Sequence, residues 1–199
     1  DFIKASVDPA FRQMMTYYVG VYYFRNKKPD QSLTYLETAK LANLTNAQIG
    51  EVKYLLGYVY FSVGQFEKAK QLLDAVRQTV GDVYYVDANY YFGFIAFKEK
   101  NYGVALSCFD IAKAASAYGK LIPFYNAQIF YFTGNAEKAL TTALDALKSG
   151  NQYYEKPLQQ LVGRLLFAKN DFTAALPYLE KYVASSKTPS SEDVYELSF

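Results

Sequence analysis

The feature that most constrains this chain is a motif that returns five times, at intervals of 34 to 37 residues. Each copy has an aromatic core around one small residue, then a turn signal, then a segment headed by a small residue. The small residues at the centre of the core are spaced 37, 36, 34 and 36 residues apart: Gly20, Gly57, Gly93, Ala127 and Gly163. A period of this length indicates a repeat array. The repeat therefore predicts an array, although a length of 199 residues alone would suggest one or two globular domains.

Each period is predicted to form two helices joined by a short turn. The turn signals are rich in Gly and Asn, which tolerate the left-handed backbone that ends a helix; they lie at residues 26–30, 63–65, 100–101, 134–135 and 169–171. After the second turn, Ala69, Leu72, Leu73 and Val76 follow helical spacing and predict one buried stripe. The chain should therefore contain about ten helices in five pairs.

The small anchors, together with Ala69, Ala105, Ala139 and Ala175 at the head of the second helices, resemble the tetratricopeptide repeat. Ser32 takes the place of this alanine in the first copy. The resemblance covers nearly the whole chain and implies an all-α fold, a right-handed α-solenoid superhelix of helix-turn-helix repeats. We expect a single array over 1–199, with repeats at 13–49, 50–85, 86–119, 120–155 and 156–189.

Both ends of the sequence carry parts of further repeats. Asp8 and Pro9 read as the N-cap and first residue of a helix, and we assign partial repeats to 1–8 and 190–199. These ends predict that the chain is a window on a longer array. The motif style of residues 170–182 also resembles long repeat proteins of Bacteroidetes cell envelopes, which favours the periplasm or envelope over the cytoplasm.

Composition argues against an enzyme. Without histidine the chain has no Ser-His-Asp or Cys-His pair and no His metal site, and no glycine-rich phosphate loop is present. We interpret Glu51 and Asp87 as ordinary surface carboxylates on helix starts, and the single cysteine, Cys108, as a small buried hydrophobe. We therefore expect no catalytic residue, cofactor or metal.

Charge and hydropathy also narrow the partners. The formal net charge is +2 without a run of five like charges, so no nucleic-acid footprint is visible. No uninterrupted apolar stretch reaches membrane-spanning length, so we expect no membrane insertion. The expected partner is a protein or peptide.

The 21 tyrosines and 15 phenylalanines offer a binding surface. The resemblance implies that first helices line an inner groove, where two aromatic ladders would run. The first ladder holds Tyr17, Tyr54, Tyr90 and Phe124; the second holds Phe24, Phe61, Phe97, Tyr131 and Phe167; a middle row between them includes Tyr58 and Phe94. Exposed aromatic patches mark interaction surfaces, and the predicted partner-binding residues are Tyr17, Tyr54, Tyr58, Tyr90, Phe94, Phe124 and Tyr131.

The alternative is that these rings belong to the core. Second-ladder aromatics could pack between neighbouring first helices, whereas the polar tip of a first-ladder tyrosine suits a wet groove better than a dry core. The Lys and Asn residues with which some members of the family hold peptide carboxylates are absent from these positions.

The favoured function is a non-enzymatic scaffold that binds a partner peptide segment in an aromatic-lined concave groove. Two alternatives remain: a structural spacer or self-assembly module of a larger envelope protein, and a glycan-binding surface, which the absence of tryptophan disfavours. The apolar face of the last helix predicts a monomer or a weak dimer through the C-terminal end.

Overall fold

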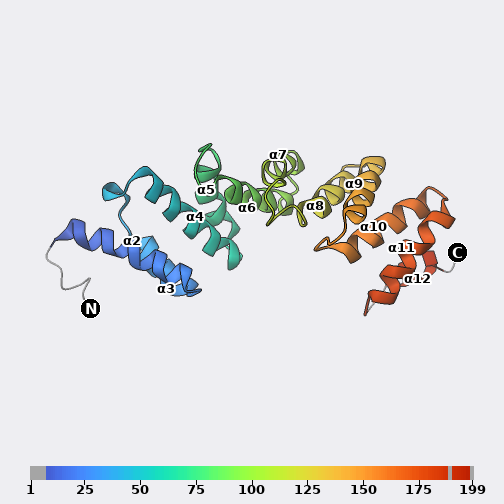
Figure 1. Ribbon diagram of the computed structural model, residues 1–199, viewed down its shortest axis with the longest axis horizontal. Helices are drawn as coiled ribbons and strands as arrows, with labels where there is room; N and C mark the ends of the chain where they lie inside the picture. Colours follow the sequence, from blue (N-terminus) through green and yellow to red (C-terminus); the bar gives the residue numbers. More distant parts are fainter. Residues whose placement is uncertain (1–7, 188–189, 198–199) are drawn as a thin grey trace. The chain divides into compact units, whose positions relative to one another are not determined.

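The computed structural model describes residues 8–187 and 190–197, and within these ranges it is helical without a strand (Figure 1). The helices follow one another in pairs, with a short 3-10 helix, η1 (Leu41–Asn43), after the first pair. The pairs are α2 (Pro9–Arg25) with α3 (Pro29–Thr38), α4 (Asn46–Ser62) with α5 (Phe66–Arg77), α6 (Tyr85–Lys98) with α7 (Tyr102–Ala112), α8 (Ile122–Phe132) with α9 (Ala136–Ser149), and α10 (Glu155–Ala168) with α11 (Phe172–Ser185).

The described chain ends with α12 (Ser191–Leu197), which lies in the predicted sixth first helix. The five helix pairs follow the predicted period, although α2 begins at Pro9 and α4 at Asn46, each four residues ahead of the predicted repeat starts at residues 13 and 50. Residues 1–7 of the predicted N-terminal partial repeat, and residues 198–199 at the other end, lie outside the described ranges.

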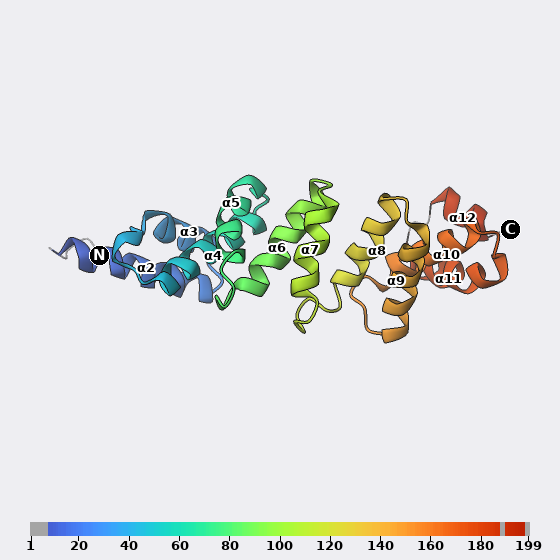
Figure 2. The ribbon, with the colours of Figure 1, turned by 90° about the horizontal axis from the view of Figure 1, so that it is seen from above.

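The chain divides into two compact units, one up to Ile111 and one from Ala112 onward. The first unit contains α2 to α6 and nearly all of α7, and the second contains α8 to α12 (Figure 2). Each unit is described by itself below.

The turn inside every pair has the same backbone form. One residue in each turn has positive φ: Gly64, Gly134 and Asn170 are of the predicted residue types, whereas in the other two turns it is Lys27 and Lys100. The next amide donates to the carbonyl five residues earlier, for example from Gln65 to Tyr60 at 2.8 Å. This is the Schellman ending, which satisfies carbonyls that the helix leaves free.

Helix starts carry side-chain caps where the sequence supplies them. The Asp8 carboxylate accepts a hydrogen bond from the Ala10 amide, which confirms the predicted N-cap of α2. Thr45 and Gln48 form a reciprocal capping box at α4. Asn135 and Asp171 cap α9 and α11, because their side chains accept hydrogen bonds from the amides of Lys138 and Ala174.

The small anchors set the distance between the two helices of a pair. A Cβ added to Gly20 would lie 2.6 Å from Leu36 Cγ, and one added to Gly163 would lie 2.7 Å from Leu179 Cγ. Both leucines belong to second helices and are buried. The anchors therefore let a branched side chain from the second helix rest on the backbone of the first.

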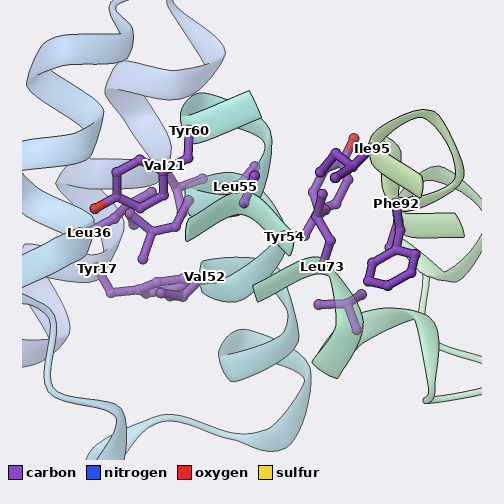
Figure 3. Packing of buried hydrophobic residues seen from close by; sticks show 14 of the residues in the cluster. Tyr17, Val21, Leu36, Val52, Tyr54, Leu55, Tyr60, Leu73, Phe92 and Ile95 are labelled. Carbon is purple, nitrogen blue, oxygen red and sulfur yellow. The ribbon is translucent and has the colours of Figure 1, made fainter. Parts of the chain in front are cut away.

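The core of the first unit runs through successive pairs. Figure 3 shows Tyr17, Leu36, Tyr54, Leu73 and Phe92 in one buried cluster. The predicted stripe of α5 is buried at Ala69, Leu73 and Val76 and half-buried at Leu72. In the second unit, alanines of α9 pack with leucines of α10 and α11 in a comparable cluster.

Candidate interaction surface on the first helices

The first-ladder tyrosines lie inside the first unit, not on its surface. Tyr17, Tyr54 and Tyr90 are 4%, 7% and 8% exposed. The expectation that their hydroxyl-bearing rings lie in a wet groove is therefore wrong. A ring between successive helix pairs removes more apolar area from water than a ring that points into a groove, and burial of that size outweighs the preference of one hydroxyl.

A second tyrosine covers the first ladder in each unit. Tyr84, the residue just before α6, stacks on Tyr54 with ring centroids 4.3 Å apart and planes 11° from parallel. Tyr154, just before α10, approaches Phe124 at 4.5 Å and its hydroxyl lies 2.8 Å from that of Tyr125. In both units, the residue before one first helix therefore shields the ladder residue of the preceding first helix.

Glu51 joins three helix pairs, so its interpretation as an ordinary surface carboxylate is wrong. Its side chain is 16% exposed, and its two oxygens accept hydrogen bonds from Tyr17 and, at 3.0 Å, from Tyr84. The Arg25 Nη2 atom lies 3.6 Å from Glu51 Oε1, while the rest of the Arg25 side chain is largely exposed. A carboxylate with two hydroxyl donors and a nearby guanidinium is well satisfied despite its burial.

The same contacts change the acidity of the tyrosines. Burial, followed by the hydrogen bond to Glu51, raises the pKa of Tyr84 to about 12 and moves the pKa of Tyr17 upward as well. Burial together with a hydrogen bond to Glu37 raises the pKa of Tyr60 to about 12. These hydroxyls therefore stay protonated donors at physiological pH.

The middle row and second ladder of the first unit remain partly open. Phe24, Tyr58, Phe61 and Phe94 are all half-buried. Their rings form a continuous series of contacts through Tyr91, with centroid distances of 5.5 Å for Phe24–Tyr58, 5.2 Å for Tyr58–Tyr91, 4.9 Å for Tyr91–Phe61 and 5.3 Å for Phe61–Phe94. The series crosses α2, α4 and α6, and each of its residues is only partly buried.

A cavity opens at the α2 end of this series. It has a volume of about 550 Å³ and lies between the C-terminal end of α2, the following turn and α4. Phe24 and Tyr58 form its aromatic wall, and Arg25 and Lys27 place cationic side chains beside it. The Tyr58 hydroxyl makes no hydrogen bond within the described part of the chain. The cavity can therefore take an apolar group and offer a hydroxyl and cations to a polar neighbour.

In the second unit, Phe124 and Tyr131 differ in exposure. Phe124 is half-buried under Tyr154, whereas Tyr131 is 47% exposed and its ring lies 5.8 Å from that of the exposed Phe132. Of the predicted binding residues, Tyr58, Phe94, Phe124 and Tyr131 therefore keep accessible ring surface, within two separate units.

Sequence reasoning named Glu51 but missed its linking role, and it did not find Tyr84 or Tyr154. A signal was present, because Tyr84 and Tyr154 lie 70 residues apart, which is two periods, each directly before a first helix. Among the residues that the structure describes, no group of three or more His, Cys, Asp or Glu side chains is placed to hold a metal ion. No described helix combines the length and apolar character needed to cross a membrane.

Comparisons with known proteins agree with this geometry. Residues 50–76, which span most of α4 and α5, match the sequence model of the tetratricopeptide repeat. Similar solved structures are MamA AMB-1, with a TM-score of 0.72 at 18% identity over 93% of this chain and 97% of that one, and MamA MSR-1, with 0.66 at 15% identity over 87% and 95%. The fold is that of a tetratricopeptide-repeat array.

A third structure, MamA 41-end from Desulfovibrio magneticus RS-1, has a TM-score of 0.67 at 18% identity and covers 92% of this chain and 100% of that one. A search of curated protein sequences finds no match. At 15–18% identity, the similarity shows that these solved structures and this chain share the tetratricopeptide-repeat fold. The predicted resemblance to the tetratricopeptide repeat and the all-helical fold class are both confirmed.

Proposed function

We propose that this chain is a non-enzymatic scaffold that binds a segment of a partner protein along the aromatic surface of its first helices. The tetratricopeptide-repeat fold supports a role in protein–protein interaction at the general level. The observation that carries the specific proposal is the open ring series from Phe24 to Phe94 with the cavity at one end.

Half-buried aromatic rings suit such a role because they are already held in place. The contacts among Tyr58, Tyr91 and Phe61 restrict the rings before binding, so a partner loses little additional side-chain entropy on their account. Tyr58 supplies a ring edge and a free hydroxyl at the cavity, and Phe94 extends the surface to α6.

The other predicted residues enter the proposal in two ways. Tyr17, Tyr54 and Tyr90 hold the helices that carry the open rings and would act on binding through the position of those helices. Phe124 and Tyr131 would offer a second contact surface in the second unit.

A photo-crosslinking residue in place of Tyr58 tests the proposal. Irradiation in native lysate should join the chain to a partner, and mass spectrometry should give the linked segment. A synthetic peptide of that segment should bind the unmodified chain and lose at least about tenfold in affinity to Tyr58→Ser, as expected of a central aromatic contact.

Tyr153→Ser is the matched control, since Tyr153 is an exposed tyrosine in the other unit. A peptide that binds Tyr58→Ser and Tyr153→Ser equally would overturn the assignment of the cavity. Reaction of soluble oligosaccharides with the same position would point to the glycan alternative.

A further inference from the structure

The cavity at the α2 end of the ring series is lined by two cations and, among the described residues, by no carboxylate. Arg25 and Lys27 are its charged lining residues, and both are exposed. Phe24 and Tyr58 form the aromatic wall beside them. An apolar wall with cations next to it fits a ligand in which an apolar group lies close to a negative charge.

Lys27 is held at the cavity without an acidic partner of its own. Its backbone has a φ of 57°, in the left-handed region where the turns after α4 and α8 carry glycine. A lysine suits this conformation less well than glycine does, so the backbone of the turn gains nothing from it. The ammonium group makes no ion pair or hydrogen bond within the described part of the chain. Its charge is therefore available to a ligand.

Arg25 also keeps most of its binding capacity. Its side chain is 73% exposed, and its Nη2 atom lies 3.6 Å from Glu51 Oε1. That carboxylate already accepts hydrogen bonds from Tyr17 and Tyr84, and a long ion pair with an exposed guanidinium contributes little. A further carboxylate can therefore pair with the planar guanidinium without displacing a strong interaction.

The acidic residues near the cavity leave one positive charge unbalanced. Arg25, Lys27 and Lys28 bring three positive charges to this region. Asp30, which lines a neighbouring hollow with both lysines, and Glu51 bring two negative charges. Three minus two leaves one, which suits a single carboxylate better than the nearly double negative charge of a phosphate group.

The ring series beyond the cavity is apolar. It continues through Tyr91 and Phe61 to Phe94, and the turn after α4 has the uncharged residues 63–65 where the turn after α2 has cations. In an extended segment, residues two positions apart lie on one side, about 7 Å from one another. A side chain placed against Phe24 therefore has its near neighbours in the segment within reach of Arg25.

We propose that the partner segment carries an aspartate or glutamate within two positions of the bulky apolar residue that fills the cavity. Its carboxylate contacts Arg25 and Lys27, the apolar residue contacts Phe24 and Tyr58, and further apolar residues lie over α4 and α6. This inference rests on the proposed function, because it gives the chemistry of the segment bound at the same surface.

Selection of phage-displayed random peptides on the full chain tests this chemistry without a known partner. Prior depletion on Tyr58→Ser removes peptides that bind elsewhere. The retained peptides should be enriched in Asp or Glu within two positions of a bulky apolar residue. On Arg25→Gln/Lys27→Gln the acidic preference should be lost, while the apolar preference remains.

Lys148→Gln/Lys169→Gln is the matched control for charge. It removes two exposed lysines from the second unit and so changes the net charge by the same amount. It should select the same acidic peptides as the native chain. Circular dichroism and urea unfolding establish that each variant is folded before selection.

Titration of one enriched peptide, capped at both ends, measures the charge contact. Replacement of its acidic residue by the corresponding amide should lower the affinity for the native chain by about three- to tenfold. The same replacement should have little effect on the affinity for Arg25→Gln/Lys27→Gln, because the cations it would contact are already absent.

The possible failures separate the two proposals. Enriched peptides that are apolar but carry no acidic residue would overturn this inference and leave the proposed binding surface in place. An acidic preference that persists in Arg25→Gln/Lys27→Gln, or that is lost equally in the lysine control, would overturn it as well. If no peptide distinguishes the native chain from Tyr58→Ser, the proposed function itself is wrong, and this inference falls with it.

Discussion

Tyr84 donates a 3.0 Å hydrogen bond to Glu51, and so ties the residue before α6 to the first turns of α4. Tyr17 of α2 donates to the other carboxylate oxygen. One side chain thereby links three successive helix pairs. In a repeat array, where stability depends on the interfaces between neighbours, such a link couples the pairs into one folding unit.

Replacement of Glu51 by Gln should lower the free energy of unfolding. The two tyrosines donate to different carboxylate oxygens, and glutamine replaces one of these oxygens by an NH2 group, which cannot accept. The charge that strengthens both bonds is also lost, so we expect a loss of about 1–3 kcal/mol. Urea unfolding followed by circular dichroism measures it. Glu67→Gln, at an exposed acid in the first turn of α5, is the control and should change stability by less than about 0.5 kcal/mol. Equal effects of the two substitutions would contradict the linking role.

Stability should also fall at alkaline pH. The pKa of Tyr84 is raised from an unfolded value of 10.0 to about 12, by burial first and by the Glu51 hydrogen bond second. Above pH 10 the unfolded chain loses this proton while the folded chain keeps it, so the contribution is complete below pH 10 and is lost as pH rises toward 12. Urea midpoints of the native chain and Tyr84→Phe should converge over this window. A difference between the two urea midpoints that stays constant from pH 10 to 12 would contradict the raised pKa of Tyr84 in the folded chain.

The two helices of a pair approach too closely for any side chain at Gly20. Gly20→Ala would bring a Cβ within 2.6 Å of Leu36 Cγ and 3.3 Å of its backbone nitrogen, and Leu36 is buried. Overpacking of this kind costs about 1–3 kcal/mol, more than the helix propensity that alanine adds. Gly103→Ala, on α7 with nothing within 4 Å of the added Cβ, should instead stabilise the protein by up to about 1 kcal/mol. Thermal unfolding should show a lower melting temperature than the native chain for Gly20→Ala and a higher one for Gly103→Ala.

Much of the fold could be predicted from the sequence because its signals are local and repeated. The positive φ of Gly64 and Asn170, and the cap at Asp8, follow from residue types that favour those conformations. The position of Tyr54 could not be predicted, because a tyrosine suits both a groove and a core. What decides is Tyr84, 30 residues away, which stacks on it. The connection between one pair and the next is irregular in length, and Tyr84 and Tyr154 are marked only by their spacing of two periods.

Cys108 should be unreactive in the folded protein. Its side chain is 1% exposed on α7, and burial raises the pKa of its thiol, so little thiolate forms and little reagent can reach it. We expect an aromatic disulfide reagent at neutral pH to react at least about a hundredfold more slowly with the native chain than with the chain in concentrated guanidinium chloride. As the chain has one cysteine, the released colour reports this site alone. Fast reaction in buffer would show that α7 opens readily.

Tyr54 and Tyr58 lie one helical turn apart on α4 and should separate stability from binding. Tyr54 is buried and stacked on Tyr84, so Tyr54→Ala should cost about 3–5 kcal/mol of unfolding free energy, in the range of other large aromatic deletions from cores. Tyr58 keeps accessible surface at the cavity, so Tyr58→Ala should cost clearly less and still weaken the partner peptide. Chemical unfolding measures the free energy of unfolding of each variant, and peptide titration measures its affinity for the partner peptide. A Tyr54→Ala protein that is as stable as the native chain but no longer binds would place the site at the first ladder, where the sequence alone first suggested it.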